Sequence, residues 1–145
     1  MTAIDPRIGV APALTFTVPG PCVPWMRAGS EGRARFTPKK QRVYQAHVAW
    51  CATAARAAAR SYPQTSSKAT RYAVALDVYM PDARRRDIDN GLKTILDACQ
   101  RILWPDDSQV RRAYVDETID REHPRVVVTV GFLPDEAIES KGARQ

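Results

Sequence analysis

The sequence has few of the residues that build disulfide-linked or zinc-containing domains. Its three cysteines (Cys22, Cys51 and Cys99) are odd in number, lie far apart and form no C-x-x-C pair. This pattern excludes a disulfide framework and a four-cysteine zinc site, and it is typical of a reducing cytosol. With His47 and His123 as the two histidines, no Ser-His-Asp arrangement can be argued. A glycine-rich nucleotide-binding loop is also absent.

Long hydrophobic runs are missing as well. No apolar stretch approaches the ~18 residues that a membrane-spanning helix needs. Residues 1–6 show no basic region followed by an apolar one, so we expect a cytoplasmic protein that is not secreted. The chain has 145 residues, of which 44% are hydrophobic and 26% are charged, so we expect one folded domain.

Positive charge is in excess, with 22 Lys and Arg against 16 Asp and Glu and a net charge of +6. Between residues 27 and 42, a single Glu31 accompanies six cations: Arg27, Arg33, Arg35, Lys39, Lys40 and Arg42. A second basic run is Arg84 to Arg86. Such patches fit a phosphate-rich partner, but a solvated charged surface gives the same pattern.

Hydrophobic periodicity predicts a mixed α/β (α+β) domain. Alternating apolar residues predict strands at residues 14–18, 72–80, 109–115 and 126–130. The last of these is apolar on both faces and is therefore expected to be central. Helices are predicted at about 37–60, starting at a Thr-Pro pair, and at about 90–103. The order β-α-β-α-β-β predicts a sheet of about four strands with two main helices packed on it.

We assign residues 13–133 to a single domain, and residues 1–12 and 134–145 to terminal tails. The first helix carries an apolar stripe with steps of four and three residues, which predicts its buried face. That stripe consists of Val43, His47, Trp50, Ala54 and Ala57. His47 and Cys51 are spaced like half of a zinc site, but no second half exists, so we interpret His47 as a core histidine.

The most informative segment for chemistry precedes the second helix. Asp87 and Asp89 would point roughly 200° apart on a regular helix, but at a strand-to-helix junction both carboxylates can turn toward one point. Lys93 follows Asp89 by four residues and so shares its helix face. A structural interpretation is also open, with aspartate as a helix cap and Asp89–Lys93 as a surface ion pair.

A second acidic pair, Asp106-Asp107, lies in a turn at the far end of the same helix. One helix cannot place both of its ends at one site. A following strand that runs back antiparallel would, however, let this pair approach the first. Three or four aspartate oxygens would then form a site for Mg²⁺ or Mn²⁺. An acidic metal site in a basic surface suits phosphodiester cleavage.

In combination, these motifs resemble the RusA-type Holliday junction resolvases, or crossover junction endodeoxyribonucleases. The resemblance covers about residues 14–132 and rests on a D-x-D-N-x-x-K pattern, an aromatic residue, two aspartates and Gln-Val. Those elements are Asp87 to Lys93, Asp97-Ala98 and Trp104 to Val110. Family membership implies a small homodimeric, Mg²⁺-dependent endonuclease of DNA recombination and repair, of a kind common in prophages. Gly91 departs from the family, which usually has a larger residue there.

Carried over residue by residue, the resemblance implies that Asp87, Asp89 and Asp107 are catalytic metal ligands and that Lys93 is the catalytic lysine. It implies Mg²⁺ as cofactor, with Mn²⁺ as an alternative. It also assigns DNA binding to the basic segments: Arg27, Arg33, Arg35, Lys39, Lys40, Arg84, Arg85 and Arg86. Whether Asp106 also binds the metal, and whether Asp97 orients Lys93 or only makes a structural hydrogen bond, stay open.

The expected reaction is hydrolysis of a four-way DNA junction by symmetric paired nicks that leave 5′-phosphate and 3′-hydroxyl ends. The expected partners are branched DNA and a second copy of the chain, with no membrane and no nucleotide cofactor, in a cytoplasmic, nucleoid-associated setting. Two alternatives remain: a broader metal-dependent nuclease that cuts flaps or forks, and a junction-binding protein without catalysis.

Overall fold

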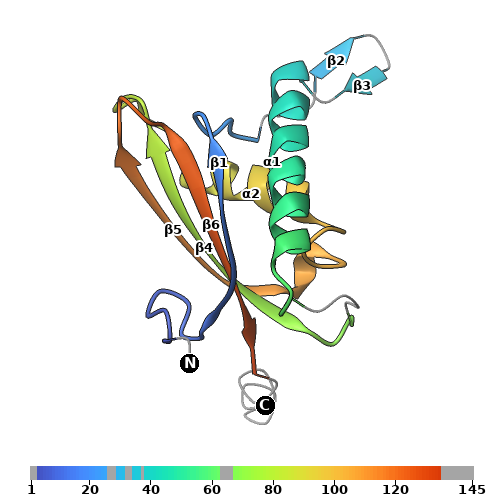
Figure 1. Ribbon diagram of the computed structural model, residues 1–145. Helices are drawn as coiled ribbons and strands as arrows, with labels where there is room; N and C mark the ends of the chain where they lie inside the picture. The colour runs from blue at the N-terminus through green and yellow to red at the C-terminus, as the bar shows by residue number, and fades with distance from the viewer. Residues whose placement is uncertain (1–2, 26–28, 32–33, 37, 63–66, 135–145) are drawn as a thin grey trace, which may run out of the picture.

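The computed structural model describes residues 3–25, 29–31, 34–36, 38–62 and 67–134. Four strands form one mixed sheet in the order β1-β6-β4-β5 (Figure 1). They are β1 (Pro12–Pro19), β4 (Arg71–Met80), β5 (Val110–Ile119) and β6 (Arg125–Leu133). The two helices are α1 (Lys39–Ala58) and α2 (Ile88–Cys99). The predicted four-stranded sheet with two helices is therefore confirmed.

A small second sheet precedes α1. Its strands are β2 (Gly29–Glu31) and β3 (Ala34–Phe36), which pair antiparallel. The predicted helix cap is shifted slightly, because α1 begins at Lys39 with Pro38 at the N-cap and no side-chain cap. Thr37 lies outside the described residues.

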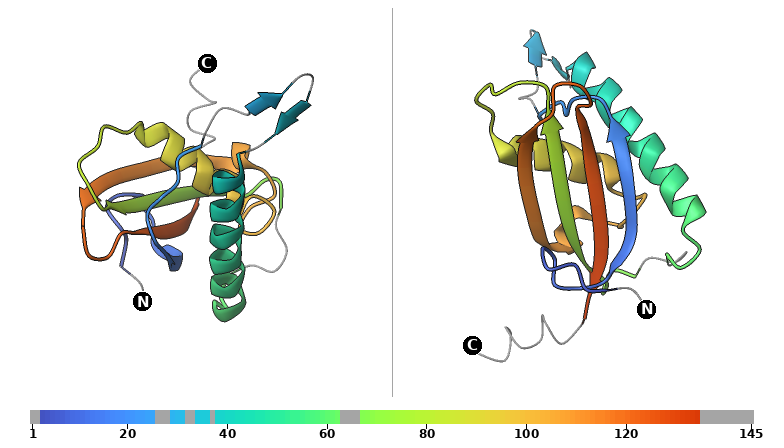
Figure 2. Two further views of the ribbon diagram at one scale, coloured as in Figure 1. Left: turned by 90° about the horizontal axis from the view of Figure 1, so that it is seen from above. Right: turned by 60° about the vertical axis from the view of Figure 1, so that its left-hand side comes forward.

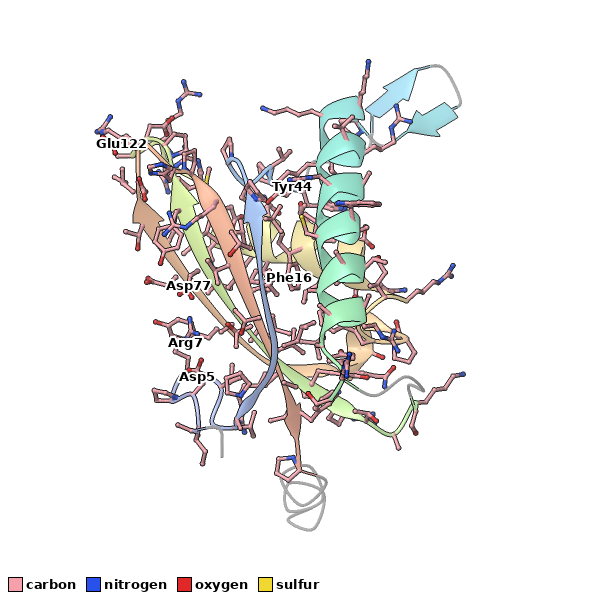
Figure 3. The ribbon with its side chains drawn as sticks, viewed as in Figure 1. Asp5, Arg7, Phe16, Tyr44, Asp77 and Glu122 are labelled. Atoms are coloured by element: carbon pink, nitrogen blue, oxygen red, sulfur yellow. The ribbon has the colours of Figure 1, made fainter. Side chains whose placement is uncertain are left out.

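Both helices lie on one side of the main sheet (Figure 2). Side chains alternate along β1, so Leu14, Phe16 and Val18 face the helices and are buried. Figure 3 shows Phe16 and Tyr44 in the layer between the sheet and α1. Strand β6 pairs with both β1 and β4, which confirms that the doubly apolar strand is central.

The predicted buried face of α1 is wrong. Its buried residues are Gln41, Tyr44, Val48 and Ala52. The side chains of Val43 and Trp50 are 61% and 74% exposed, and His47 is exposed as well. Both sets of residues have helical spacing, so the sequence alone does not decide between them; α1 packs against β1 and α2, and the set that faces this layer is the buried one. An apolar stripe on α1 is left facing outward.

Residues 5–10, within the predicted N-terminal tail, fold against the opposite face of the sheet. Ile8 is fully buried there in a small cluster with Ala73 and Ala75. Arg7 forms ion pairs with Asp5 and Asp77, and Figure 3 shows these three residues on the other side of the sheet from Phe16. A hydrogen bond from Arg7 lowers the pKa of Asp5. The segment covers part of a face that the helices leave open.

The connection β4-α2-β5 determines where the acidic residues lie. Strand β5 pairs with β4 in parallel, from Tyr72↔Val110 to Met80↔Ile119, so the predicted antiparallel return of this strand is wrong. A parallel pair needs a crossover, and α2 is that crossover. It begins beyond the carboxyl end of β4 and leads back toward the amino end of β5. Among the described residues, no helix is long and apolar enough to span a membrane.

Candidate active site

The two aspartates of the D-x-D pattern lie at the start of α2. Asp87 is the N-cap residue, with extended backbone angles (φ −93°, ψ 112°), and its carboxylate accepts a hydrogen bond from the Asp89 backbone N–H at 3.2 Å. Both side chains are exposed. The junction is thus non-helical at Asp87, as the sequence predicts, and the capping role is confirmed. Capping brings Asp87 back over the first turn, beside Asp89.

Arg86 holds the loop between β4 and α2. Its guanidinium donates to the carboxylate of Asp82 and to the backbone carbonyls of Asp82 (3.0 Å) and Arg84 (3.2 Å). It also reaches Glu117 on β5 at 3.4 Å. Its side chain is only 17% exposed. A hydrogen bond from the Arg84 backbone N–H, reinforced by Arg86, lowers the pKa of Asp82. Arg86 therefore fixes the backbone that presents Asp87.

An open hollow of about 490 Å³ lies beside Asp87 and is lined by Arg85, Arg86, Asp87 and Ile88. Arg84 and Arg85 are exposed around it. On the inner side of Asp87 is a narrow recess, lined in part by Cys22 and Glu117. Burial raises the pKa of the Cys22 thiol to about 11, so it is neutral near pH 7. The outer hollow combines the carboxylate of Asp87 with the exposed side chain of Arg85, which suits a phosphate group together with a metal ion.

Lys93 lies one turn along α2 from Asp89 and projects over an aromatic ring. Its Nζ is 3.6 Å from the centroid of the Trp25 ring. No ion pair of the described residues involves Lys93, so the alternative of an Asp89–Lys93 surface pair is not what forms. Asp97 instead accepts a hydrogen bond from Gln45 Nε2 at 3.0 Å. That contact gives Asp97 a structural role between the two helices.

The basic residues lie at the same end of the molecule as Asp87. In Figure 1 the loop 81–87 and the start of α1 are both at the upper end. Lys39 and Lys40 are exposed on the first turn of α1, where they border an open groove of about 680 Å³. Three predicted DNA-binding side chains lie outside the description: Arg27, Arg33 and the side chain of Arg35.

Asp107 lies at the opposite end of α2, where its hydrogen bonds are already made. Its Oδ1 accepts from Trp104 Nε1 at 2.9 Å, and the Trp104 side chain is only 1% exposed. With its amide nitrogen turned toward this carboxylate, Gln100 donates at 3.0 Å. Burial raises the pKa of Asp107, as do the nearby Asp97 and Asp106. Trp104 partly offsets that rise.

The rest of this motif closes the turn before β5. The Asp106 backbone N–H donates to Gln109 Oε1 at 3.1 Å, and Asp106 Oδ2 accepts from Ser108 Oγ at 2.6 Å. Gln109, 4% exposed, donates to the carbonyls of Ser67 and Thr70, both at 2.9 Å. The Gln-Val element therefore joins the turn before β4 to the turn before β5.

The structure brings some predicted site residues together and separates others. Asp87, Asp89 and Lys93 share the first two turns of α2, and Asp107 lies beyond its last turn. Among the residues that the structure describes, no group of three His, Cys, Asp or Glu side chains could hold a metal ion. A single described chain therefore does not form the predicted three-aspartate cluster.

The sequence analysis does not predict the roles of two residues at this site, Arg86 and Trp25. The sequence predicts Arg86 as a DNA contact, but the structure commits its side chain to Asp82 and Glu117, and its i, i+4 spacing from Asp82 is the signal in the sequence. Arg84 also lies 3.7 Å from Asp82, but its side chain is 83% exposed. Trp25 lies 68 positions from Lys93, and no local pattern links them.

A comparison with protein families places this chain. The sequence profile of the family described as endodeoxyribonuclease RusA matches residues 19–131. A comparison with curated proteins found no match. The matched range includes β4, α2, β5 and all of the acidic and lysine positions discussed above. Because it spans most of the chain, the protein belongs to the RusA endodeoxyribonuclease family, whose members act as Holliday junction resolvases on branched DNA.

Proposed function

We propose that this chain resolves four-way DNA junctions by metal-dependent hydrolysis of one phosphodiester in each of two opposed strands. The observation that carries the proposal is the placement of Asp87 and Asp89 at the exposed start of α2, between Arg84 and Arg85 on one side and Lys93 on the other. Carboxylates surrounded by cations suit a site that binds a polyanion and a metal ion together.

The residues at this end fit a Mg²⁺ or Mn²⁺ ion. RusA-type resolvases in general depend on a divalent metal. Mg²⁺ is commonly held by one or two carboxylates together with substrate phosphate and water, rather than by an all-protein cage. Asp87 and Asp89 supply those oxygens. When bound, the ion supplies Lewis-acid stabilisation of the charge that develops on the phosphate.

The chain's own residues account for the remaining tasks. Arg84 and Arg85 hold the DNA backbone against the hollow beside Asp87. Lys93 donates from its ammonium to a phosphate oxygen, an electrostatic contribution on the order of 10²–10³ in rate. Water attacks phosphorus, the bond to the 3′ oxygen breaks, and the products are a 5′-phosphate and a 3′-hydroxyl.

The predicted role of Asp107 as a third ligand requires a second subunit, because the two ends of one α2 cannot meet. We propose a homodimer, in which a two-fold axis places one site on each of two symmetry-related strands. The outward stripe of α1 is our candidate interface. Its members, Val43, His47, Trp50, Ala54 and Ala57, alternate steps of four and three, the spacing that packs two identical helices side by side.

Sedimentation of the Trp50→Glu variant tests this interface. Thr118→Glu, which adds the same charge at an exposed position of β5, is the matched control. We expect the parent and the control to sediment as dimers and Trp50→Glu as a monomer. A dimeric Trp50→Glu protein would exclude the α1 stripe as the interface.

The function itself is tested with a labelled synthetic four-way junction and a linear duplex of the same sequence, each with and without Mg²⁺. We expect paired nicks at symmetric positions in the junction, only with the metal, and an intact duplex. Equal cutting of the junction and the duplex would favour a general nuclease, as would equal cutting of flap or fork substrates added to the same assay. Binding without cleavage would favour a non-catalytic junction-binding protein.

A further inference from the structure

Within the part of the chain that the structure describes, no carboxylate forms an ion pair that would fix the side chain of Lys93. A lysine on an exposed helix face has four rotatable bonds, and its ammonium samples many positions unless something holds it. Among the described residues, the contact that does so is the ring of Trp25, with Nζ 3.6 Å from the centroid. That distance is well within the ~6 Å range of a cation–π interaction, and tryptophan is the strongest such partner.

Trp25 is itself held against the first turn of α2. Its backbone N–H donates to the carbonyl of Asn90 at 2.9 Å, directly beside the D-x-D pattern. The preceding residues continue the contact: a Cβ at Gly91 would lie 3.6 Å from Cys22 Sγ, and Pro24 lines the recess behind Asp87. Residues 22–25 therefore pack directly against the first turns of α2.

We propose that Trp25 is a positioning residue for Lys93. The ring restricts the ammonium to one side of α2, one turn from Asp89, and leaves its outward N–H groups free to donate to the scissile phosphate. The contacts that the structure gives Trp25 are with the Asn90 carbonyl and the Lys93 ammonium, so its proposed role is exerted through Lys93. This inference rests on the proposed function of Lys93, and the experiment below separates the two.

The test is the single-turnover cleavage rate of a saturated synthetic four-way junction with Mg²⁺, alongside the dissociation constant for the same junction with Ca²⁺ in place of Mg²⁺. The variants are Trp25→Leu, Trp25→Phe, Lys93→Met and the double variant Trp25→Leu/Lys93→Met. Tyr114→Leu, an exposed aromatic on the open sheet face, is the matched control.

We expect Trp25→Leu to slow cleavage about tenfold, with the dissociation constant unchanged within about twofold. Trp25→Phe keeps a ring and should retain most of the rate. Lys93→Met should lose on the order of 10²–10³, and the double variant should be no slower than Lys93→Met alone, because the ring has nothing left to position.

A second readout does not depend on activity. The ring current of Trp25 should shift the Lys93 ε-methylene proton resonances upfield in the parent, and Trp25→Leu should return them to ordinary lysine positions. Should Trp25→Leu destabilise the fold, Trp25→Phe and this spectrum still decide the matter.

Two results would overturn the proposal: Trp25→Leu cutting at the parental rate, or a Trp25→Leu loss that is just as large in the Lys93→Met background. Parental cleavage by Lys93→Met is a different outcome. It would overturn the proposed role of Lys93, and the positioning role of Trp25 with it, while an upfield-shifted Lys93 spectrum would show that the contact itself exists.

Discussion

Each end of α2 has a pair of aspartates in the sequence, but the two pairs have different surroundings in the structure. At its start, Asp87 and Asp89 are exposed beside an open hollow, with exposed arginines next to them and Lys93 one turn on. Beyond its end, Asp107 is half-buried and accepts hydrogen bonds from Trp104 and Gln100, and Asp106 is used within its own turn. One aspartate pair is open to an added ligand, and the other is already satisfied.

This difference shows that the hydrogen-bond partners of an aspartate, rather than its residue type, indicate whether its carboxylate is free to bind a metal ion. Asp87 and Asp89 have carboxylates that face solvent, where a metal ion and a substrate can reach them. Asp107 already accepts indole and amide hydrogens that stabilise its turn, so a metal ion held with a second subunit would have to use its remaining lone pairs. A similar distinction applies within the basic run. Arg84 and Arg85 are exposed, with a long 3.7 Å pair between Arg84 and Asp82, whereas Arg86 is largely buried between Asp82 and Glu117. The predictions below test both contrasts.

The largest effect is expected at the start of α2. Asp89→Asn removes one charged ligand oxygen, and a loss of several kcal/mol of transition-state stabilisation corresponds to on the order of 10³ in rate. Junction binding should be retained, and metal-free stability should not fall, since one repulsive charge is gone. The measurement pairs single-turnover cleavage with a melting curve.

Asp116→Asn, the same charge change on an exposed position of β5, is the matched control and should cut at the parental rate. An Asp89→Asn protein that also cuts junctions at that rate would show that the start of α2 is not the metal-binding end.

A smaller effect is expected in the basic run, where neighbouring arginines should differ. Arg84→Gln with Arg85→Gln should weaken junction binding and reduce the slope of log K against log salt by about 0.9 for each lost phosphate contact, with little change in stability. Arg86→Gln should instead lower the free energy of unfolding, because the backbone carbonyls of Asp82 and Arg84 lose a donor and Glu117 loses its charged partner. Salt titrations and urea denaturation measure the two quantities, and the contrast fails if Arg86→Gln changes only the salt slope.

The smallest effect concerns the pH dependence of stability at Asp107. Burial raises the pKa of this carboxyl in the folded protein, so ionisation opposes folding. That destabilisation is fully present above the folded pKa and is lost as pH falls toward the ordinary aspartate value. Asp107→Asn keeps an oxygen for Trp104, so its Tm should slightly exceed the parent's at neutral pH and match it in acid. A Tm advantage that grows on acidification would contradict this assignment.

Much of the fold was predictable because its strands carry local patterns. Tyr72, Val74 and Leu76 alternate on β4, and Val126 to Val130 are apolar on both faces of the central β6. The buried face of α1 could not be predicted, because Gln41, Tyr44, Val48 and Ala52 repeat with the same helical steps as the more apolar set that includes Val43 and Trp50. Periodicity shows that a helix has an apolar stripe, but only the neighbouring layer decides which stripe is buried.

The candidate site was predictable to the same degree. Local spacing located Asp87, Asp89 and Lys93 on one turn-to-helix junction. The approach of Asp107 to the other aspartates depends on an antiparallel β5, but β5 is parallel to β4, the arrangement that a helix joining two adjacent strands of one sheet favours. The Trp25–Lys93 contact joins residues far apart in the chain, so no window of sequence contains it.

The central claim is that the metal ion binds at the start of α2 and not beyond its end. Its most direct test is paramagnetic broadening of backbone amide resonances by Mn²⁺, in the protein without DNA. Bound Mn²⁺ broadens nearby amide signals steeply with distance. The account predicts that signals from residues 85–93 disappear first, with those of Asp106 to Gln109 spared in Trp50→Glu, the proposed monomer. Broadening centred on residues 104–109, or none localised at residues 85–93, would contradict it.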